Sequence, residues 1–139
     1  MEALKTAWYG YRGGNAGYHY DGTRYHGVNL HSLFYRGTIE FRYFNGTLHA
    51  GEIKAYVQLC LAIAQRALTV TSTQRARRIV PEGCEKWTMR LFLKTLGMVG
   101  PEFATARLHF MKRLSGSAEN PSRVTVARAS RDVQARAVA

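Results

Sequence analysis

Residues 38–43 alternate strictly between polar and apolar side chains, which is the pattern of a half-buried β-strand. The six positions are Thr38, Ile39, Glu40, Phe41, Arg42 and Tyr43. Successive side chains on a strand point to opposite faces, so Glu40 and Arg42 are expected to share the polar face. Their simplest interpretation is an ion pair on a half-exposed sheet. The functional alternative is a ligand site, in which the carboxylate binds Mg²⁺ and the guanidinium binds a phosphate.

A second strand is expected over residues 28–35, joined to the first by a hairpin turn at Arg36-Gly37. This hairpin sets four opposed pairs: Tyr35 with Thr38, Leu33 with Glu40, His31 with Arg42, and Asn29 with Phe44. Opposed residues share a face of the sheet. Asn29 and His31 are therefore expected to join Glu40 and Arg42 in one polar patch, with apolar side chains on the other face.

Three helices are expected after the strands. The first runs from about residue 49 to 69, and its apolar side chains recur at helical spacing. That stripe consists of Ile53, Tyr56, Val57, Cys60, Ala64 and Leu68. The second helix spans about 84–96 and ends at Gly97, and the third starts at Pro101 and ends near Leu114. Together these elements predict an α+β fold of antiparallel β-strands packed by about three helices.

Two segments are expected to lack regular structure. Residues 9–27 are dense in glycine and tyrosine, which is typical of an irregular loop. From Ser115 onward the chain has no leucine, isoleucine or aromatic residue. Residues 117–139 are therefore expected to form a mobile basic tail, with an Ala/Arg helix near 124–138 as the alternative.

The net charge of +11 is unevenly distributed along the 139 residues. Residues 1–65 carry six basic and four acidic side chains, or +2, whereas residues 66–139 carry 14 and five, or +9. A basic half of this kind fits a module that binds nucleic acid, and Arg12-Gly13-Gly14 between tyrosines fits stacking on bases. A solvated face on two amphipathic helices is the commoner origin of such a charge pattern.

Several classes of protein and site are not indicated. Cys60 and Cys84 have no CxxC spacing, and the five histidines have no H-x₃-H or HExxH spacing, so neither a zinc site nor a redox motif is expected. Charged and amide side chains interrupt the longest apolar helix, which makes it too short to span a bilayer. The start of the chain lacks the basic-then-apolar order of a signal peptide. A reduced, cytoplasmic setting without a membrane fits these features.

Three consecutive segments follow the motif order of a known family. Residues 24–34 read RYHGVNLHSLF, residues 37–51 read GTIEFRYFNGTLHAG, and residues 52–64 read EIKAYVQLCLAIA. This order resembles the putative amidoligase family, whose pattern is RYxxxNLxxL, then GTxEFRxFNGTLH, then a helix of KAYxQLxLA type. Weaker similarity continues through residues 88–100 and 102–109, so the resemblance covers roughly residues 5–116.

The resemblance implies a glutamine synthetase-like fold and an ATP-dependent ligase. Such a ligase joins a small carboxylate to an amine or peptide through an acyl phosphate. The cofactors implied are ATP and Mg²⁺, with Glu40 as a metal ligand and catalytic residue and Arg42 as the residue that grips the phosphate. The other implied contacts to substrate or nucleotide are Arg24, Asn29, His31 and His49. From its position, His49 fits either a substrate contact or a helix cap.

The similarity extends to only the C-terminal half of the family pattern. Family members are about twice this length, and their earlier half supplies paired glutamates that hold the metals. Residues 1–116 are therefore expected to be a partial amidoligase domain, half of a glutamine synthetase-like catalytic domain, with a complementing N-terminal half as its partner. Two alternatives stay open: a basic non-enzymatic module that binds nucleic acid or a protein, and an inactive fragment.

Overall fold

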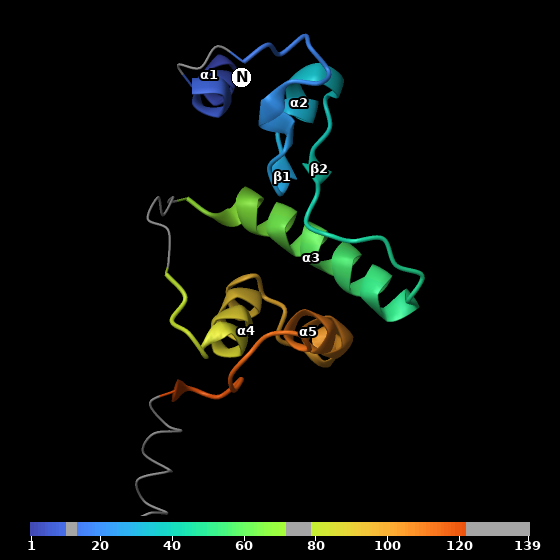
Figure 1. The fold of residues 1–139 in the computed structure, drawn as a ribbon, viewed down its shortest axis with the longest axis vertical. Coiled ribbons are helices and arrows are strands. Elements are labelled where there is room, and N and C mark those ends of the chain that lie inside the picture. The colour runs from blue at the N-terminus through green and yellow to red at the C-terminus, as the bar shows by residue number, and fades with distance from the viewer. Residues whose placement is uncertain (11–13, 72–78, 122–139) are drawn as a thin grey trace, which may run out of the picture. The chain divides into compact units, whose positions relative to one another are not determined.

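The computed structural model describes residues 1–10, 14–71 and 79–121 (Figure 1). The fold is α+β, as predicted, with five α-helices and one two-stranded antiparallel sheet among the described residues. The chain divides into two compact units, residues 1–46 and residues 47–139. Among the described helices, none combines the length and the apolar character needed to cross a membrane.

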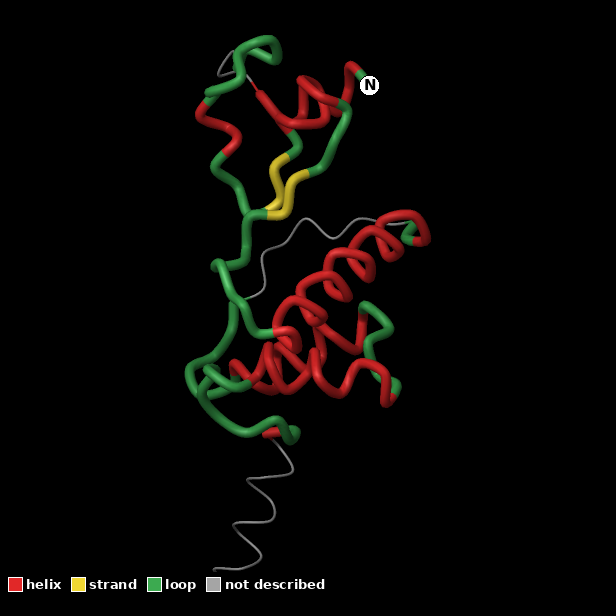
Figure 2. The backbone as a smooth tube through the Cα atoms, turned by 90° about the vertical axis from the view of Figure 1, so that its right-hand side faces the viewer, coloured by secondary structure: helices red, strands yellow, loops and turns green. Residues whose placement is uncertain are grey.

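The first unit holds the sheet and three short helical segments. Helix α1 spans Glu2–Tyr9, the 3₁₀ turn η2 spans Gly22–Arg24, and helix α2 spans His31–Arg36. Strand β1 spans Val28–Asn29 and strand β2 spans Glu40–Phe41. The two strands lie side by side (yellow in Figure 2), with Val28 opposite Phe41 and Asn29 opposite Glu40.

The predicted hairpin is wrong in both its connection and its register. Residues 31–36 form helix α2 between the strands, and Gly37 ends that helix in a left-handed conformation with φ 73°. The N–H of Gly37 donates to the carbonyls of Ser32 and Leu33, so the expected turn is in fact a helix C-cap. Leu30, Leu33 and Phe34 stand at i, i+3 and i+4, a helical spacing that the strand interpretation overlooked.

The strand predicted from residue 38 onward is also shorter than expected. Only Glu40–Phe41 pairs with β1, although the polar and apolar alternation extends over residues 38–43. Ile39 and Tyr43 were expected on a buried face, yet they are 53% and 61% exposed. The alternation therefore marks an extended segment of which two residues are hydrogen-bonded into the sheet.

The second unit is helical. Helix α3 spans Ala50–Thr69, α4 spans Glu85–Thr95, and α5 spans Ala104–Met111 after the 3₁₀ turn η3 at Pro101–Phe103. Helices α3 and α5 make the most extensive contact in the unit. The core combines small and large side chains, all buried: Ala55, Leu59, Leu93, Met98 and Ala106.

The buried stripe predicted for α3 is wrong at four of its six positions, whereas Tyr56 and Cys60 are half-buried. Ala55 and Leu59 are buried, whereas Ile53, Val57 and Leu68 are 47%, 53% and 84% exposed. Apolar residues occur on more than one side of this helix, so periodicity alone did not settle which side packs. Ala55 on α3 and Ala106 on α5 are both fully buried, and these two helices pack against each other.

The predicted ends of the later helices are largely correct. Helix α4 stops just before Gly97, which has φ 79°, and Pro101 opens the turn that leads into α5. The last helix ends at Met111 and not at Leu114. Of the expected tail, residues 117–121 are described, and Arg90 on α4 donates to the carbonyl of Ala118 at 3.0 Å. The remainder of the tail, with its alternative helix near 124–138, lies outside the described residues.

Two backbone segments cross closely beside α4. Gly116 has φ 81°, and a Cβ at this position would overlap the carbonyl oxygen of Gly83. Next to this crossing, the N–H of Lys86 donates to the carbonyl of Ser115 at 3.2 Å. The Ser115 hydroxyl donates to Oε2 of Glu85 at 2.5 Å. The segment after α5 is thus fixed to the start of α4.

Candidate functional site

Asn29 and Glu40 form the centre of the polar cluster in the first unit. They oppose each other in the sheet, and Nδ2 of Asn29 donates to Oε2 of Glu40 at 2.7 Å. The Asn29 side chain also donates to the Ser32 hydroxyl at 3.0 Å and accepts from the His31 backbone N–H at 2.9 Å. Asn29 is 1% exposed, so its amide is buried with its hydrogen-bonding groups engaged.

Glu40 also pairs with Arg42, two residues along the chain. Nη1 of Arg42 lies 3.7 Å from Oε2 of Glu40, and the two side chains are 31% and 45% exposed. The guanidinium carbon of Arg42 sits 5.3 Å from the centre of the Tyr25 ring, within the range of a cation–π contact. The simple ion-pair interpretation therefore holds, and both groups remain accessible to a ligand.

His31 lies at the start of α2 and is buried. Its Nδ1 is 2.6 Å from the hydroxyl of Tyr9, whereas its Nε2 has no hydrogen-bond partner among the described residues. Its ring is stacked parallel to that of Tyr35, with an interplanar angle of 14°. Burial, followed by the negative charge of Asp21, raises the pKa of Tyr9, so the phenol stays protonated.

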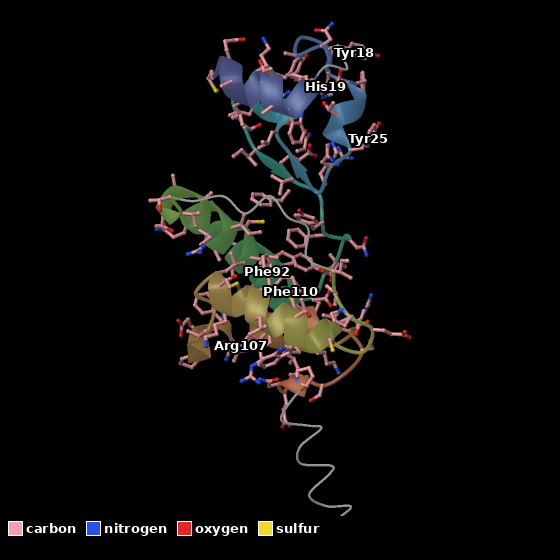
Figure 3. The ribbon with its side chains drawn as sticks, turned by 90° about the vertical axis from the view of Figure 1, so that its left-hand side faces the viewer. Tyr18, His19, Tyr25, Phe92, Arg107 and Phe110 are labelled. Carbon is pink, nitrogen blue, oxygen red and sulfur yellow. The ribbon has the colours of Figure 1, made fainter. Side chains whose placement is uncertain are left out.

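Arg24 is held at the end of η2 by backbone and aromatic contacts. Its Nη1 donates to the carbonyl of His19 at 3.3 Å, and its guanidinium lies over the rings of Tyr20 and Tyr25. Figure 3 shows His19 and Tyr25 on the segment that precedes β1. Asp21 fixes this segment by accepting from Asn15 and Thr23. The Thr23 hydrogen bonds lead the causes that lower the pKa of Asp21 to about 2.

These side chains surround a cavity of about 250 Å³. Its lining residues come from η2, β1, α2 and β2 and from the segment before η2: His19, Arg24, Asn29, His31, Ser32, Tyr35, Arg36, Thr38 and Glu40. Four of the six predicted site residues are therefore brought together here. Arg42 adjoins the cavity through Glu40, and the wrong register did not separate Asn29 from Glu40.

A family model described as "Putative amidoligase enzyme" matches residues 1–64. The resemblance to the putative amidoligase family is confirmed over this segment. Neither the curated proteins nor the solved structures include a match to the chain. The amidoligase match covers the whole cavity and the first part of α3. The weaker similarity expected for residues 88–109 lies beyond it and stays a prediction.

His49, the sixth predicted site residue, lies in the second unit, inside the amidoligase segment. Its Nδ1 accepts from the backbone N–H of Glu52 at 3.3 Å, which makes it the N-cap of α3. Its ring stands edge-on to that of His109 on α5, with centroids 4.9 Å apart. Of the two alternatives for His49, the structure contains the helix cap, and a substrate contact stays a prediction.

Sequence reasoning missed Tyr9, which contacts His31, and five of the nine residues that line the cavity: His19, Ser32, Tyr35, Arg36 and Thr38. Tyr9 was assigned to an irregular loop, yet it ends α1, a helix that was not expected. Tyr35 and Arg36 were assigned to a strand and a turn, yet both belong to α2. The signal available for α2 was the spacing of its apolar residues. Residues 11–13 are not described, so the stacking alternative for Arg12-Gly13-Gly14 lies outside the described part.

The cavity has one carboxylate among its described lining residues, that of Glu40. Across residues 1–10, 14–71 and 79–121, no three or more His, Cys, Asp or Glu side chains are grouped to hold a metal ion. Oε2 of Glu40 is engaged by Asn29 and Arg42. Both of these contacts involve Oε2, and Oε1 of the same carboxylate takes part in neither.

Proposed function

We propose that this chain is a module of an ATP-dependent ligase that joins a carboxylate to an amine. The observation that carries the proposal is the Asn29–Glu40–Arg42 cluster, of which Asn29 and Glu40 line a cavity within the segment that matches the amidoligase family. The match supports a ligase-type function. The particular reaction, ATP and Mg²⁺ belong to the proposal.

The proposed reaction has two steps. A substrate carboxylate takes the γ-phosphoryl group of ATP, which gives an acyl phosphate and ADP. An amine then attacks that carbonyl carbon, an amide bond forms, and inorganic phosphate and a proton leave. Phosphoryl transfer requires the protein mainly to position the reactants and to stabilise developing charge.

The residues of the cavity suit these tasks. Oε1 of Glu40 is the ligand available to Mg²⁺, which would neutralise charge on phosphate oxygens. The planar guanidinium of Arg42 can donate two parallel hydrogen bonds to a phosphoryl group. Asn29 holds Glu40 in place, and Arg24 and His31 line the cavity where a reactant would be oriented.

The proposal includes a partner that supplies further carboxylates. Mg²⁺ held between phosphates is usually bound by more than one protein carboxylate, and Glu40 is the single one in the described cavity lining. A complementing N-terminal half, supplied as a second polypeptide, is the partner that the amidoligase resemblance implies. The chain alone is then expected to bind Mg-ATP weakly.

The test measures ADP release with Mg-ATP, a panel of carboxylates and amines, and a complementing half. Glu40→Gln preserves the shape of the side chain and removes its charge. Turnover should fall at least about a hundredfold, as it does when a strong electrostatic stabiliser is lost. Glu82→Gln, at an exposed position outside the cavity, is the matched control and should leave turnover unchanged. Full activity in Glu40→Gln would refute the metal role.

The alternative of a basic binding module makes the opposite prediction. Its support is the net charge of +9 over residues 66–139. Binding of DNA or RNA that weakens steeply as salt rises, without ADP release in any mixture, would favour that alternative. The Glu40→Gln variant would then bind nucleic acid as tightly as the wild-type chain does.

A further inference from the structure

The contact between Tyr9 and His31 determines where the proton of the imidazole ring sits. Both side chains are buried, at 7% and 2% exposure, and the Tyr9 hydroxyl is 2.6 Å from Nδ1 of His31. A neutral imidazole carries one N–H and one acceptor nitrogen. The direction of this single hydrogen bond therefore decides whether the other nitrogen, Nε2, carries a proton or a lone pair.

Two proton arrangements are compatible with the 2.6 Å contact between Tyr9 and His31. If Nδ1–H donates to the tyrosine oxygen, both the phenol proton and the Nε2 lone pair lack partners. If the phenol donates to Nδ1, only the Nε2–H lacks a partner. Each unpaired buried polar group is destabilising, so the second arrangement, with one such group in place of two, is favoured. His31 is then an N–H donor at Nε2, and that donor is unpartnered among the described residues.

The surroundings of His31 favour an anion as the partner of this donor. Arg24 and Arg36 line the same cavity, one from the end of η2 and one from the end of α2. The positive charges of both guanidiniums reach the cavity. The pKa of His19, another lining residue, is lowered first by desolvation and next by the charges of Arg24 and Arg36. The one carboxylate in the lining, Glu40, already has its Oε2 engaged by Asn29 and Arg42.

The size of the cavity limits what it accepts. Its volume of about 250 Å³ lies below the roughly 300–1,000 Å³ of sites that enclose drug-sized ligands. A single carboxylate or phosphoryl group fits this space, whereas a whole nucleotide does not. The base and ribose of ATP would therefore be held elsewhere.

We propose that Tyr9 holds His31 in the Nε2–H form, and that this N–H, with Arg24 and Arg36, binds one oxyanion group of a reactant. The oxyanion is either the carboxylate or the phosphoryl group. The reactant's identity rests on the proposed ligase function, but binding of a small oxyanion requires neither ATP nor metal. His31 is thus a binding residue, and Tyr9 is a positioning residue that acts through it.

The first measurement uses the unmodified chain. Two-bond ¹H–¹⁵N spectra of the histidine rings distinguish the two neutral forms. We expect His31 in the Nε2–H form, with an Nε2 signal that shifts saturably on addition of inorganic phosphate or sodium acetate at constant ionic strength. The anion with the lower Kd identifies which reactant group the cavity holds. An Nδ1–H form, or no shift beyond that of sodium chloride, would overturn the proposal.

The second measurement uses variants. Tyr9→Phe removes the donor that fixes the ring, so the Kd for the preferred anion should rise about tenfold, the equivalent of about 1.4 kcal/mol. Tyr18→Phe is the matched control, because Tyr18 is exposed, and its Kd should stay unchanged. An unchanged Kd in folded Tyr9→Phe would refute the positioning role. If Tyr9→Phe does not fold, the spectra of the unmodified chain still decide the tautomer.

The two proposals can fail separately. Saturable anion shifts at His31 without ADP release in any mixture would leave the oxyanion site standing and refute the ligase. ADP release that depends on Glu40, without any anion shift at His31, would leave the ligase standing and refute the oxyanion site.

Discussion

Asn29 and Glu40 lie opposite each other in the two-stranded sheet and share a 2.7 Å hydrogen bond. The amide of Asn29 is buried, whereas the carboxylate of Glu40 is 45% exposed. A rigid, buried donor therefore fixes one oxygen of an accessible carboxylate. This arrangement orients the functional group without enclosing it.

Asn29→Asp should destabilise the first unit strongly. The substitution keeps the acceptor for the His31 backbone N–H, but it loses both donated hydrogen bonds and places a carboxylate against Glu40. We expect the free energy of unfolding to fall by about 3 kcal/mol at pH 7, as measured in urea. Asn45→Asp, at an exposed position, is the control. The deficit should shrink below about pH 4, where protonation restores a donor.

Arg42→Lys should show whether turnover depends on the charge of Arg42 alone or also on its planar geometry. Lysine keeps the positive charge near Glu40 but loses the planar fork and much of the contact with the Tyr25 ring. The melting temperature should stay within a few degrees of the wild type, while turnover in the complemented assay falls at least about tenfold. Arg113→Lys, which alters an exposed residue after α5, should change neither quantity. Full turnover in Arg42→Lys would reduce the role of Arg42 to general charge.

Glu52 ties α3 to the end of α5 and should make the second unit sensitive to acid. Its carboxylate pairs with Lys112 and accepts from the Thr47 hydroxyl at 2.7 Å. These hydrogen bonds, that of Lys112 first, lower the pKa of Glu52 from 4.5 to about 2. A carboxylate with a lowered pKa stabilises the fold above its ordinary pKa. That stabilisation is lost as the pH falls from about 4.5 to about 2.

Glu52→Gln should therefore lower the melting temperature at pH 7, with a difference from the wild type that disappears near pH 2. Thermal unfolding followed by circular dichroism across this pH range checks the expectation. Glu82→Gln serves as the control and should follow the wild type at every pH. A pH-independent difference for Glu52→Gln would show that the side chain acts through packing and not through its charge.

Gly51→Ala should destabilise the protein although alanine is the better helix former. A Cβ at Gly51 would lie 2.7 Å from Nε2 of His109 and 3.0 Å from the His49 ring. The expected gain of about 1 kcal/mol from helix propensity should therefore become a loss. Adding Gly51→Ala to His109→Ala should cost less than Gly51→Ala alone, because the nearest obstacle is gone while the His49 ring remains. Gly46→Ala, where a Cβ meets open space, is the control.

Local signals in the sequence predicted the second unit better than the first. The end of α4 follows from Gly97, because glycine tolerates the positive φ that ends a helix. The start of α5 follows from Pro101, because proline fixes φ at a helical value. The packed side of α3 was not predictable, because apolar side chains occur on both its buried and its exposed sides. The packed side depends on contacts with α5, which lies far away in the sequence.

The sequence predicted which residues belong to the candidate site better than it predicted how they are connected. The predicted hairpin placed Asn29, His31 and Glu40 in one polar patch, and the structure gathers them around one cavity. The predicted connection between these residues was wrong, because helix α2 lies where a strand was expected. Tyr9 was not predictable as a member, since its contact with His31 joins residues 22 positions apart through a helix that was not expected.

The crossing of Gly83 and Gly116 closes the chain between them into a loop that contains both α4 and α5. Since the hydrogen bonds at Glu85 and Lys86 hold the same point, neither helix can separate far without the crossing opening first. Backbone amides in the middle of α4 and α5 should therefore exchange with deuterium at matching free energies, as one foldon. Any side chain larger than hydrogen at Gly116 should divide that foldon into two.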